Sequence, residues 1–413
     1  MRKRLDKDNE TKTDSKATPA TEKSHDQLTL INKQSYQYSS SGLSGLKKVA
    51  LLLCIIYFSV PVILCLFPWI LGHFVYLHWV RFPYFVDLAN PTHLSLNHTV
   101  NLYLSPEEGI YLGIWHTVPD SQWQQAQGEG PEWYSESLGD GSPVIIYLHG
   151  NGGSRAVNHR VQLVKILSAA GYHVLSLDYR GYGDSSGVPS ESGMTSDAIY
   201  LYQWVKTRSG NSQVYLWGHS LGTGVASNAA VKIQKTHQHE MGLERAGARE
   251  LFGRIKADLG QSYGVDGVIL EAPYTNMEEE VASHPLTVVR CILLRITSIL
   301  FRFQIYRYLA GFQSVLHYIM QGNNMAFAND ENLKSLTTRI LLLHAEDDGV
   351  VPFPMSQKLY QIARQAHRQW NSEDQVAMVT YGESLGYSHN YIYLDPNLTT
   401  VVGRFLQSTN DQQ

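Results

Sequence analysis

Residues Val214 to Gly224 read VYLWGHSLGTG and place Ser220 between two glycines, each two positions away. The apolar, aromatic run before the serine is typical of a buried strand, and the run after it can continue as a helix. A direct turn from strand to helix strains the backbone, and glycines on both sides let neighbouring elements approach without a Cβ clash. The pattern is the nucleophile elbow G-x-S-x-G, which exposes a serine hydroxyl for attack on a substrate.

A serine hydroxyl is a weak nucleophile unless a base accepts its proton and a carboxylate orients that base. The apolar run RILLLHAEDD ends in two aspartates, of which the strand-end pattern D-x-x-V-P selects Asp348, with Asp347 as the alternative. After the last apolar run, the loop GYSHN offers His389 as the base. Serine, acid and histidine in this order along the chain are found in α/β-hydrolases.

Acyl transfer also needs donors for the negative charge that develops on the substrate oxygen. The glycine-rich stretch HGNGG, residues 149–153, can present the backbone N–H of Asn151 beside that of Leu221, so that the two form an oxyanion hole. His149 is interpreted as a residue that shapes this loop. The 3 cysteines form no CxxC pair, and we expect neither a metal nor a cofactor.

Six apolar runs bounded by turn signals read as strands: residues 144–150, 173–179, 214–220, 267–273, 339–348 and 375–382. Between the first two, apolar residues recur at helical spacing from Val157 to Leu167, and between the next two from Ala198 to Val205. Alternating strands and helices predict an α/β fold, with a mostly parallel central sheet, helices on both faces and ligands at the strand carboxyl ends. Residues 83–140 have room for leading antiparallel strands.

The N-terminal part has a different character. Residues 1–46 are polar and lack core-forming periodicity, so we interpret them as a disordered tail. The uncharged stretch from Val49 to Gly72 is long enough for a bilayer, and we predict a transmembrane signal-anchor helix over residues 47–80. Lysines before the stretch outnumber basic residues just after it, which predicts a cytoplasmic tail and places residues 81–413 on the lumenal or outer side.

Two glycosylation sequons begin at Asn97 and Asn397, and both would lie on the lumenal side of the membrane in this topology. We select Asn97 as the candidate glycosylation site. The net charge of −4 on 413 residues gives no support for nucleic-acid binding.

Several stretches together carry a family resemblance: HGNGG, DYRGYGDS, GHSLGTG, HAEDDGVVPF and GYSHNYIY, with VRFPYF, NHT, WHTVP and FANDEN. From about residue 47 to its end, the chain resembles the membrane-anchored lysophosphatidylserine lipases of the α/β-hydrolase-domain family. The resemblance implies a single-pass type II protein of the endoplasmic reticulum membrane with a lumenal catalytic domain. It implies hydrolysis of lysophosphatidylserine and, more loosely, of monoacylglycerols, with Ser220, Asp348 and His389 as nucleophile, acid and base.

Two segments depart from the family pattern. Residues 235–263 look like an insertion, and residues 288–320, within an expected cap or lid at residues 275–335, look longer than the family pattern. Within the cap, the apolar stretch 288–312 contains four arginines and predicts either an amphipathic helix on the bilayer or a packed cap helix. Alternative functions are a thioesterase or a protein deacylase with the same triad, an acyltransferase, or a membrane-anchored scaffold without catalysis.

Overall fold

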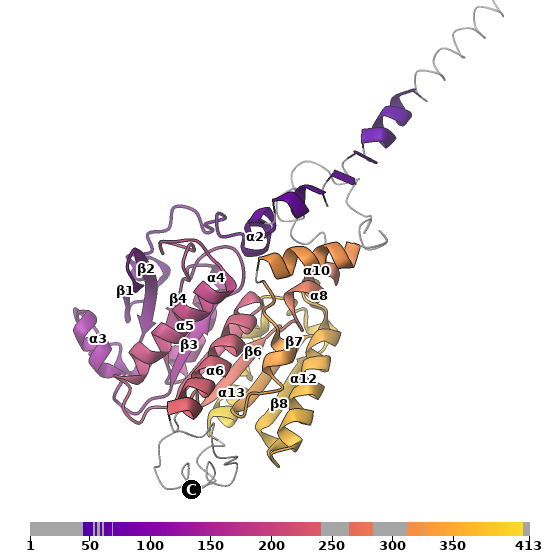
Figure 1. The fold of residues 1–413 in the computed structure, drawn as a ribbon. Helices are drawn as coiled ribbons and strands as arrows, with labels where there is room; N and C mark the ends of the chain where they lie inside the picture. Colours follow the sequence, from indigo (N-terminus) through magenta and orange to yellow (C-terminus); the bar gives the residue numbers. More distant parts are fainter. Residues whose placement is uncertain are drawn as a thin grey trace, which may run out of the picture. The chain divides into compact units, whose positions relative to one another are not determined.

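A computed structural model of the chain places eight strands, among the residues that it describes, side by side in one sheet (Figure 1). Their order is β1-β2-β4-β3-β5-β6-β7-β8. The strands are β1 (Thr99–Glu107), β2 (Ile110–Thr117), β3 (Val144–Leu148), β4 (His173–Leu177), β5 (Val214–His219), β6 (Gly267–Glu271), β7 (Arg339–Ala345) and β8 (Val376–Tyr381). The pairs β1–β2 and β2–β4 are antiparallel, and the other pairs are parallel. The predicted mostly parallel sheet is confirmed, and β1 and β2 are its leading antiparallel strands.

The structure describes residues 44–52, 54–55, 58–59, 62–67, 69–240, 264–283, 312–323 and 325–407. The chain divides into two units, residues 1–62 and 63–413, and every described residue of the first unit is helical. Besides the helical residues 63–66, the α-helices that the structure describes in the second unit are α2 (Trp69–Tyr76), α3 (Pro131–Ser137), α4 (Asn158–Ala169), α5 (Glu191–Lys206), α6 (Leu221–Glu240), α8 (Met277–Ser283), α10 (Phe312–Gly322), α11 (Asn329–Asn332), α12 (Phe353–Arg368) and α13 (Leu398–Gln407).

Several sequence predictions fall on other parts of the chain. The predicted tail up to residue 43, positions within the predicted span 47–80, residues 241–263 of the predicted insertion and residues 284–311 of the predicted cap all lie outside the described residues. In the described ranges, no helix combines the length and the apolar character that crossing a bilayer requires.

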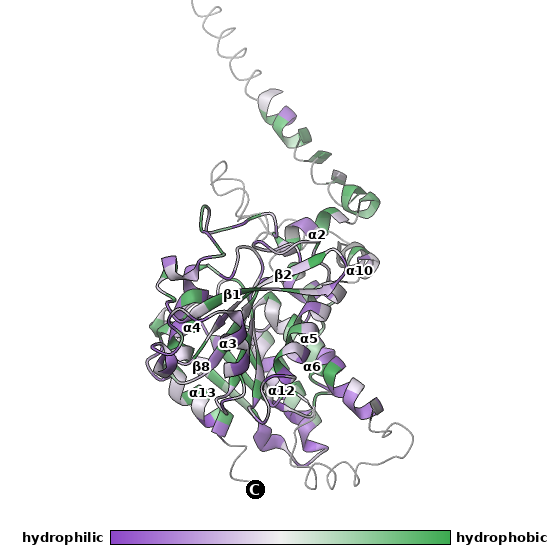
Figure 2. Ribbon diagram, turned by 90° about the vertical axis from the view of Figure 1, so that its left-hand side faces the viewer, coloured by the Kyte–Doolittle hydropathy of each residue, from purple (hydrophilic) through white to green (hydrophobic). Residues whose placement is uncertain are grey.

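Hydrophobic side chains cover both faces of the sheet. Successive residues of a strand point to opposite faces, and β3 is buried along its whole length. Ile146 belongs to the cluster formed with α5, α6 and α12, whereas Ile145 and Tyr147 belong to the cluster formed with α4 and α13. The strands in the middle of the sheet are accordingly hydrophobic (Figure 2). Helices on both faces were predicted from the alternation of elements, and this arrangement is confirmed.

The segment that enters this unit packs against its core. Leu71, Val75 and Tyr76 of α2 are buried in the same cluster as α5 and α6. The helix ends at Tyr76, and the following residues run along the loop after β3. The last residues of the predicted span therefore contribute to the core of this unit and contact the loop after β3.

Candidate active site

Ser220 stands at the corner where β5 turns directly into α6. Its φ of 51° lies in the left-handed region, which non-glycine residues rarely adopt, so the corner is strained. Its backbone N–H donates to the carbonyl of Glu271 at 2.9 Å, and its carbonyl accepts from the N–H of Thr223 at 2.8 Å. These bonds hold the strained conformation expected for a nucleophile elbow.

The glycines beside the serine are required by close approach. A Cβ on Gly218 would lie 2.3 Å from the carbonyl oxygen of Gly222, and a Cβ on Gly222 would lie 1.9 Å from that of Leu148. Both contacts are with backbone, which cannot move aside as a flexible side chain would. The turn from β5 into α6, and its packing against β3, therefore require glycine at both positions, as the spacing predicted.

The structure brings the predicted acid and base together. The ring Nδ1–H of His389 donates to Oδ2 of Asp348 at 2.7 Å, and both side chains are buried. Burial alone would raise the pKa of Asp348, but His389 and His344 hold it far below its usual range, so the group is a carboxylate. Because Nδ1 carries the hydrogen, Nε2 is the free acceptor of the His389 ring.

The two neighbouring aspartates have different contacts. Oδ1 of Asp348 accepts from the backbone N–H groups of Val350 and Val351, at 2.8 and 3.0 Å. Asp347 instead accepts from the N–H of Ser388, at 2.9 and 3.0 Å, and so anchors the loop that carries His389. Of the two candidates from the sequence, Asp348 is the one that contacts the histidine.

Ser220 and His389 line the same pocket, which has a volume of about 550 Å³. Asn151 and Leu221, the predicted oxyanion donors, line it as well. The hydrogen bonds among the described residues include none between Ser220 and His389, and such contacts are often long in the absence of substrate. All five predicted catalytic and oxyanion residues thus lie around one cavity or, for Asp348, directly behind the histidine.

His219 ties the histidine loop to the elbow, a contact that the sequence did not reveal. Its Nε2–H donates to the carbonyl of His389 at 2.9 Å, and the two rings lie 5.0 Å apart. Burial lowers the pKa of His219 to about 3, and the nearby His389 ring adds to this effect, so the His219 ring is neutral. The residue before the nucleophile therefore helps to position the base.

The loop after β3 has most of its N–H groups occupied. Those of Gly152, Gly153 and Ser154 donate to carbonyls at the end of α2 and in the segment after it, at 3.2, 2.8 and 2.9 Å. In the described part of the chain, neither the N–H of Asn151 nor that of Leu221 has an acceptor. These two groups are therefore available to a substrate oxygen, which is the arrangement that an oxyanion hole requires.

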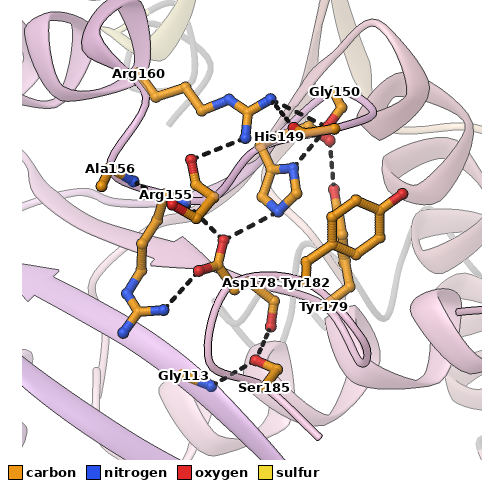
Figure 3. A network of polar contacts seen from close by, with 12 residues as sticks. Gly113, His149, Gly150, Arg155, Ala156, Arg160, Asp178, Tyr179, Tyr182 and Ser185 are labelled. Atoms are coloured by element: carbon orange, nitrogen blue, oxygen red, sulfur yellow. Dashed lines mark hydrogen bonds and ion pairs between the residues drawn. The ribbon is translucent and has the colours of Figure 1, made fainter. Parts of the chain in front are cut away.

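A buried guanidinium orients this loop from behind (Figure 3). Arg160 of α4 donates to the carbonyls of Gly150 and Gly152, at 3.2 and 2.9 Å, and to that of Ser154 at 2.9 Å. Carbonyls that turn toward the arginine leave the N–H groups of the same peptides facing the other way. Arg160 was missed from the sequence, although it stands four and seven residues before the core positions Val164 and Leu167.

A second buried cluster supports the start of the loop (Figure 3). Asp178, at the end of β4, contacts Nε2 of His149 at 3.2 Å and Nη1 of Arg155 at 2.6 Å. Burial would raise the pKa of Asp178, but Arg155 and His149 lower it. Arg155 also binds Asp184 at 2.6 Å. His149 therefore shapes the loop, as we interpreted it from the sequence.

Glu271 closes β6 beside the elbow and was not identified from the sequence. Its carboxyl is buried, and its Oε2 accepts from Nε1–H of Trp217 at 2.9 Å. Burial raises its pKa from 4.5 to about 7, although the Trp217 hydrogen bond opposes this rise. Between pH 4.5 and 7 the folded chain therefore binds more protons at this site than the unfolded chain does. Its contribution to stability is present below pH 4.5 and is lost as the pH rises through 7.

Replacing Glu271 by glutamine is expected to remove this pH dependence. A pKa difference of this size corresponds to about 3 kcal/mol. Between pH 5 and pH 8 the free energy of unfolding should therefore fall further for the wild-type chain than for the variant, by up to about 3 kcal/mol. The free energy of unfolding of both proteins at the two pH values measures the effect. The exposed Glu383→Gln serves as the control, and parallel pH curves for wild type and Glu271→Gln would contradict the prediction.

Comparison with known proteins agrees with this fold and site, which define an α/β-hydrolase. Residues 143–237 match the family model of the alpha/beta hydrolase fold. Among solved structures, the esterase Pf2001 of Pyrococcus furiosus is similar, with a TM-score of 0.51 and 15% identity over 80% of this chain and 97% of that one. At this identity the likeness supports the fold alone.

Relatives found by sequence are more similar to this chain than that solved structure is. The lysophosphatidylserine lipase ABHD12 of Danio rerio is 43% identical over 88% of this chain and 84% of its own length. That of Xenopus tropicalis is 43% identical over 89% and 84%, and the human protein ABHD12B is 42% identical over 80% and 79%. The chain belongs to the ABHD12 family of the α/β-hydrolases. It is a serine ester hydrolase, as the sequence predicted.

Proposed function

We propose that the chain cleaves the acyl ester of single-chain lipids, with lysophosphatidylserine as the main substrate and monoacylglycerols as secondary ones. The observation that carries this proposal is the 43% identity, over 88% of the chain, to a relative that is named as a lysophosphatidylserine lipase. The pocket agrees with it: apolar side chains such as Val75, Leu77 and Val281 line it together with the serine.

The proposed reaction begins with Ser220. Nε2 of His389 accepts the hydroxyl proton while the serine oxygen attacks the ester carbonyl. The backbone N–H groups of Asn151 and Leu221 stabilise the resulting oxyanion, and Asp348 holds the protonated ring in place. The ring then donates its proton to the departing alcohol, which is the glycerophosphoserine part of the substrate.

A water molecule completes the cycle. His389 takes one of its protons, and the resulting hydroxide attacks the acyl-enzyme on Ser220. The same two N–H groups bind the second oxyanion, and collapse of this intermediate releases a fatty acid and restores the serine. No metal or cofactor enters these steps.

The substrate class is tested by competition. The purified full chain is offered 1-oleoyl-lysophosphatidylserine, 1-oleoylglycerol, oleoyl-coenzyme A and a palmitoylated peptide, and release of free fatty acid is measured. We expect the highest kcat/KM for lysophosphatidylserine. Preference for the thioester or the peptide would favour a thioesterase or deacylase, and acyl transfer to an added alcohol faster than hydrolysis would favour an acyltransferase.

We also propose that the chain is a single-pass type II protein of the endoplasmic reticulum membrane with a lumenal catalytic domain. The uncharged stretch 49–72 and the lysines before it support this topology, because basic residues favour the cytoplasmic side. Asn97 is exposed and stands two residues before the start of β1.

Glycosylation of Asn97 tests the lumenal placement. In mammalian cells, treatment with peptide N-glycosidase should increase the gel mobility of the wild-type chain, and Asn97→Gln should reduce this shift. Asn397→Gln serves as the comparison at the second exposed sequon. A wild-type chain whose mobility does not change on treatment would count against a lumenal domain.

A further inference from the structure

Two side chains that line the pocket each carry a buried polar atom without a partner among the described residues. Oε2 of Glu280, on α8, is buried and accepts no hydrogen bond, and Glu280 lines the pocket. The hydroxyl of Tyr274, three residues after β6, is also buried and unpaired, and the side chain is only 1% exposed. Tyr274 lines the same pocket as Ser220. Because both side chains line the pocket, a molecule bound there can supply the partner that buried polar groups normally have.

Glu280 differs from the acidic residues before it on α8. Glu278 pairs with His317 at 2.7 Å, and Glu279 pairs with Lys358 at 3.0 Å. Both of these contacts are exposed, whereas Glu280 faces the pocket. Of the three consecutive glutamates Glu278, Glu279 and Glu280, only Glu280 has no cationic partner in the described part of the chain.

The environment of Glu280 is suited to a cation that arrives with the substrate. Burial raises the pKa of its carboxyl to about 8, and the Asp348 carboxylate adds to this rise. A cation placed beside Glu280 would reverse the effect, because it stabilises the carboxylate. Because Oε2 is buried, the attraction between such a cation and the carboxylate is stronger than it would be in water.

We propose that Glu280 and the hydroxyl of Tyr274 form a subsite for a primary ammonium group on the substrate head group. The carboxylate accepts one ammonium N–H, and the tyrosine oxygen can accept another. The inference rests on the proposed function, since lysophosphatidylserine carries such an ammonium group and a monoacylglycerol does not. The subsite would therefore select among head groups while the acyl ester lies at Ser220.

The pocket also presents a charge of the opposite sign. Arg160 lines it, and its guanidinium contacts carbonyl groups of the loop after β3. A buried cation favours anionic groups nearby, so one cavity offers a positive field from α4 and a carboxyl from α8. A head group that carries both an ammonium and anionic groups matches this combination better than a neutral glycerol does.

Glu280→Gln tests the subsite, because it keeps the size and the hydrogen-bonding groups and removes the charge. The purified full chain is assayed with four 1-oleoyl substrates: lysophosphatidylserine and lysophosphatidylethanolamine, which carry the ammonium, and lysophosphatidylglycerol and 1-oleoylglycerol, which do not. We expect kcat/KM to fall about tenfold or more for the first two and to stay within about twofold for the others. Glu278→Gln, on the same helix, should change none of the four values.

A second variant and the wild-type chain complete the test. Tyr274→Phe should produce a smaller loss with the same selectivity for ammonium-bearing substrates. An equal loss for all four substrates, or no loss for any, would overturn the subsite. Failure of the proposed function looks different: the wild-type chain would not hydrolyse lysophosphatidylserine, and the subsite inference would fall with it.

Discussion

Replacing Ser220 by alanine is expected to lower kcat/KM for lysophosphatidylserine by about four orders of magnitude or more. Without the hydroxyl no acyl-enzyme can form, and the remaining groups can only bind the substrate and polarise its carbonyl. The variant should still fold. The elbow is held by backbone bonds to Glu271 and Thr223, which the substitution leaves in place, and alanine is no larger than serine.

Two measurements separate loss of chemistry from loss of fold. A fluorophosphonate probe should label the wild-type chain at Ser220 and should not label Ser220→Ala, while the thermal unfolding midpoints of the two proteins stay close. Ser192→Ala, at an exposed position of α5, is the matched control and should retain labelling and turnover. Turnover by Ser220→Ala at a rate near that of the wild type would end the proposal of an acyl-enzyme on this residue.

The sheet could be predicted because its strands are continuous apolar runs. The six runs found in the sequence correspond to β3–β8 and begin within one residue of the observed strands. The observed strands are shorter at the carboxyl end, where polar residues such as Asp178 and Asp348 leave the ladder and enter loops. The carboxyl ends of parallel strands are where ligands bind in such sheets, so the same pattern located the site.

The glycine pattern also made the elbow predictable. A close backbone approach excludes every side chain, and only glycine satisfies it, as the contact of Gly222 with Leu148 demonstrates. The choice between Asp347 and Asp348 was harder. Both residues follow the same strand, and which carboxylate reaches His389 depends on how the loop folds back.

The parts that the sequence did not reveal depend on tertiary contacts between distant segments. The loop after β3 is held by the carbonyls of Tyr76, Val80 and Phe82, and any residue type can supply a carbonyl. The burial of Glu271 and Glu280 is equally invisible, because a glutamate at the end of a strand or on a short helix is usually solvated. Their pKa values arise from what packs around them in the fold.

Replacing Asp348 by asparagine is the second change with a large expected effect, a fall in kcat/KM on the order of 10³- to 10⁴-fold. The N–H groups of Val350 and Val351 both point at Oδ1, so the asparagine must place its oxygen there. Its NH₂ group then faces Nδ1 of His389. The ring can accept from this group only if its hydrogen moves to Nε2, and that tautomer cannot take the proton of Ser220.

Asp347→Asn is the matched control, because it makes the same chemical change one residue earlier. Its carboxylate accepts from the N–H of Ser388, and an asparagine oxygen can accept the same bond, so a loss of less than about tenfold is expected. Both variants are assayed for lysophosphatidylserine hydrolysis and for the rate of fluorophosphonate labelling. A larger loss of activity for Asp347→Asn than for Asp348→Asn would show that Asp347, and not Asp348, is the carboxylate that orients His389. If the geometry of Asp348 governs the histidine, the labelling rate of Asp348→Asn falls in parallel with turnover, since both reactions need the same proton transfer from Ser220.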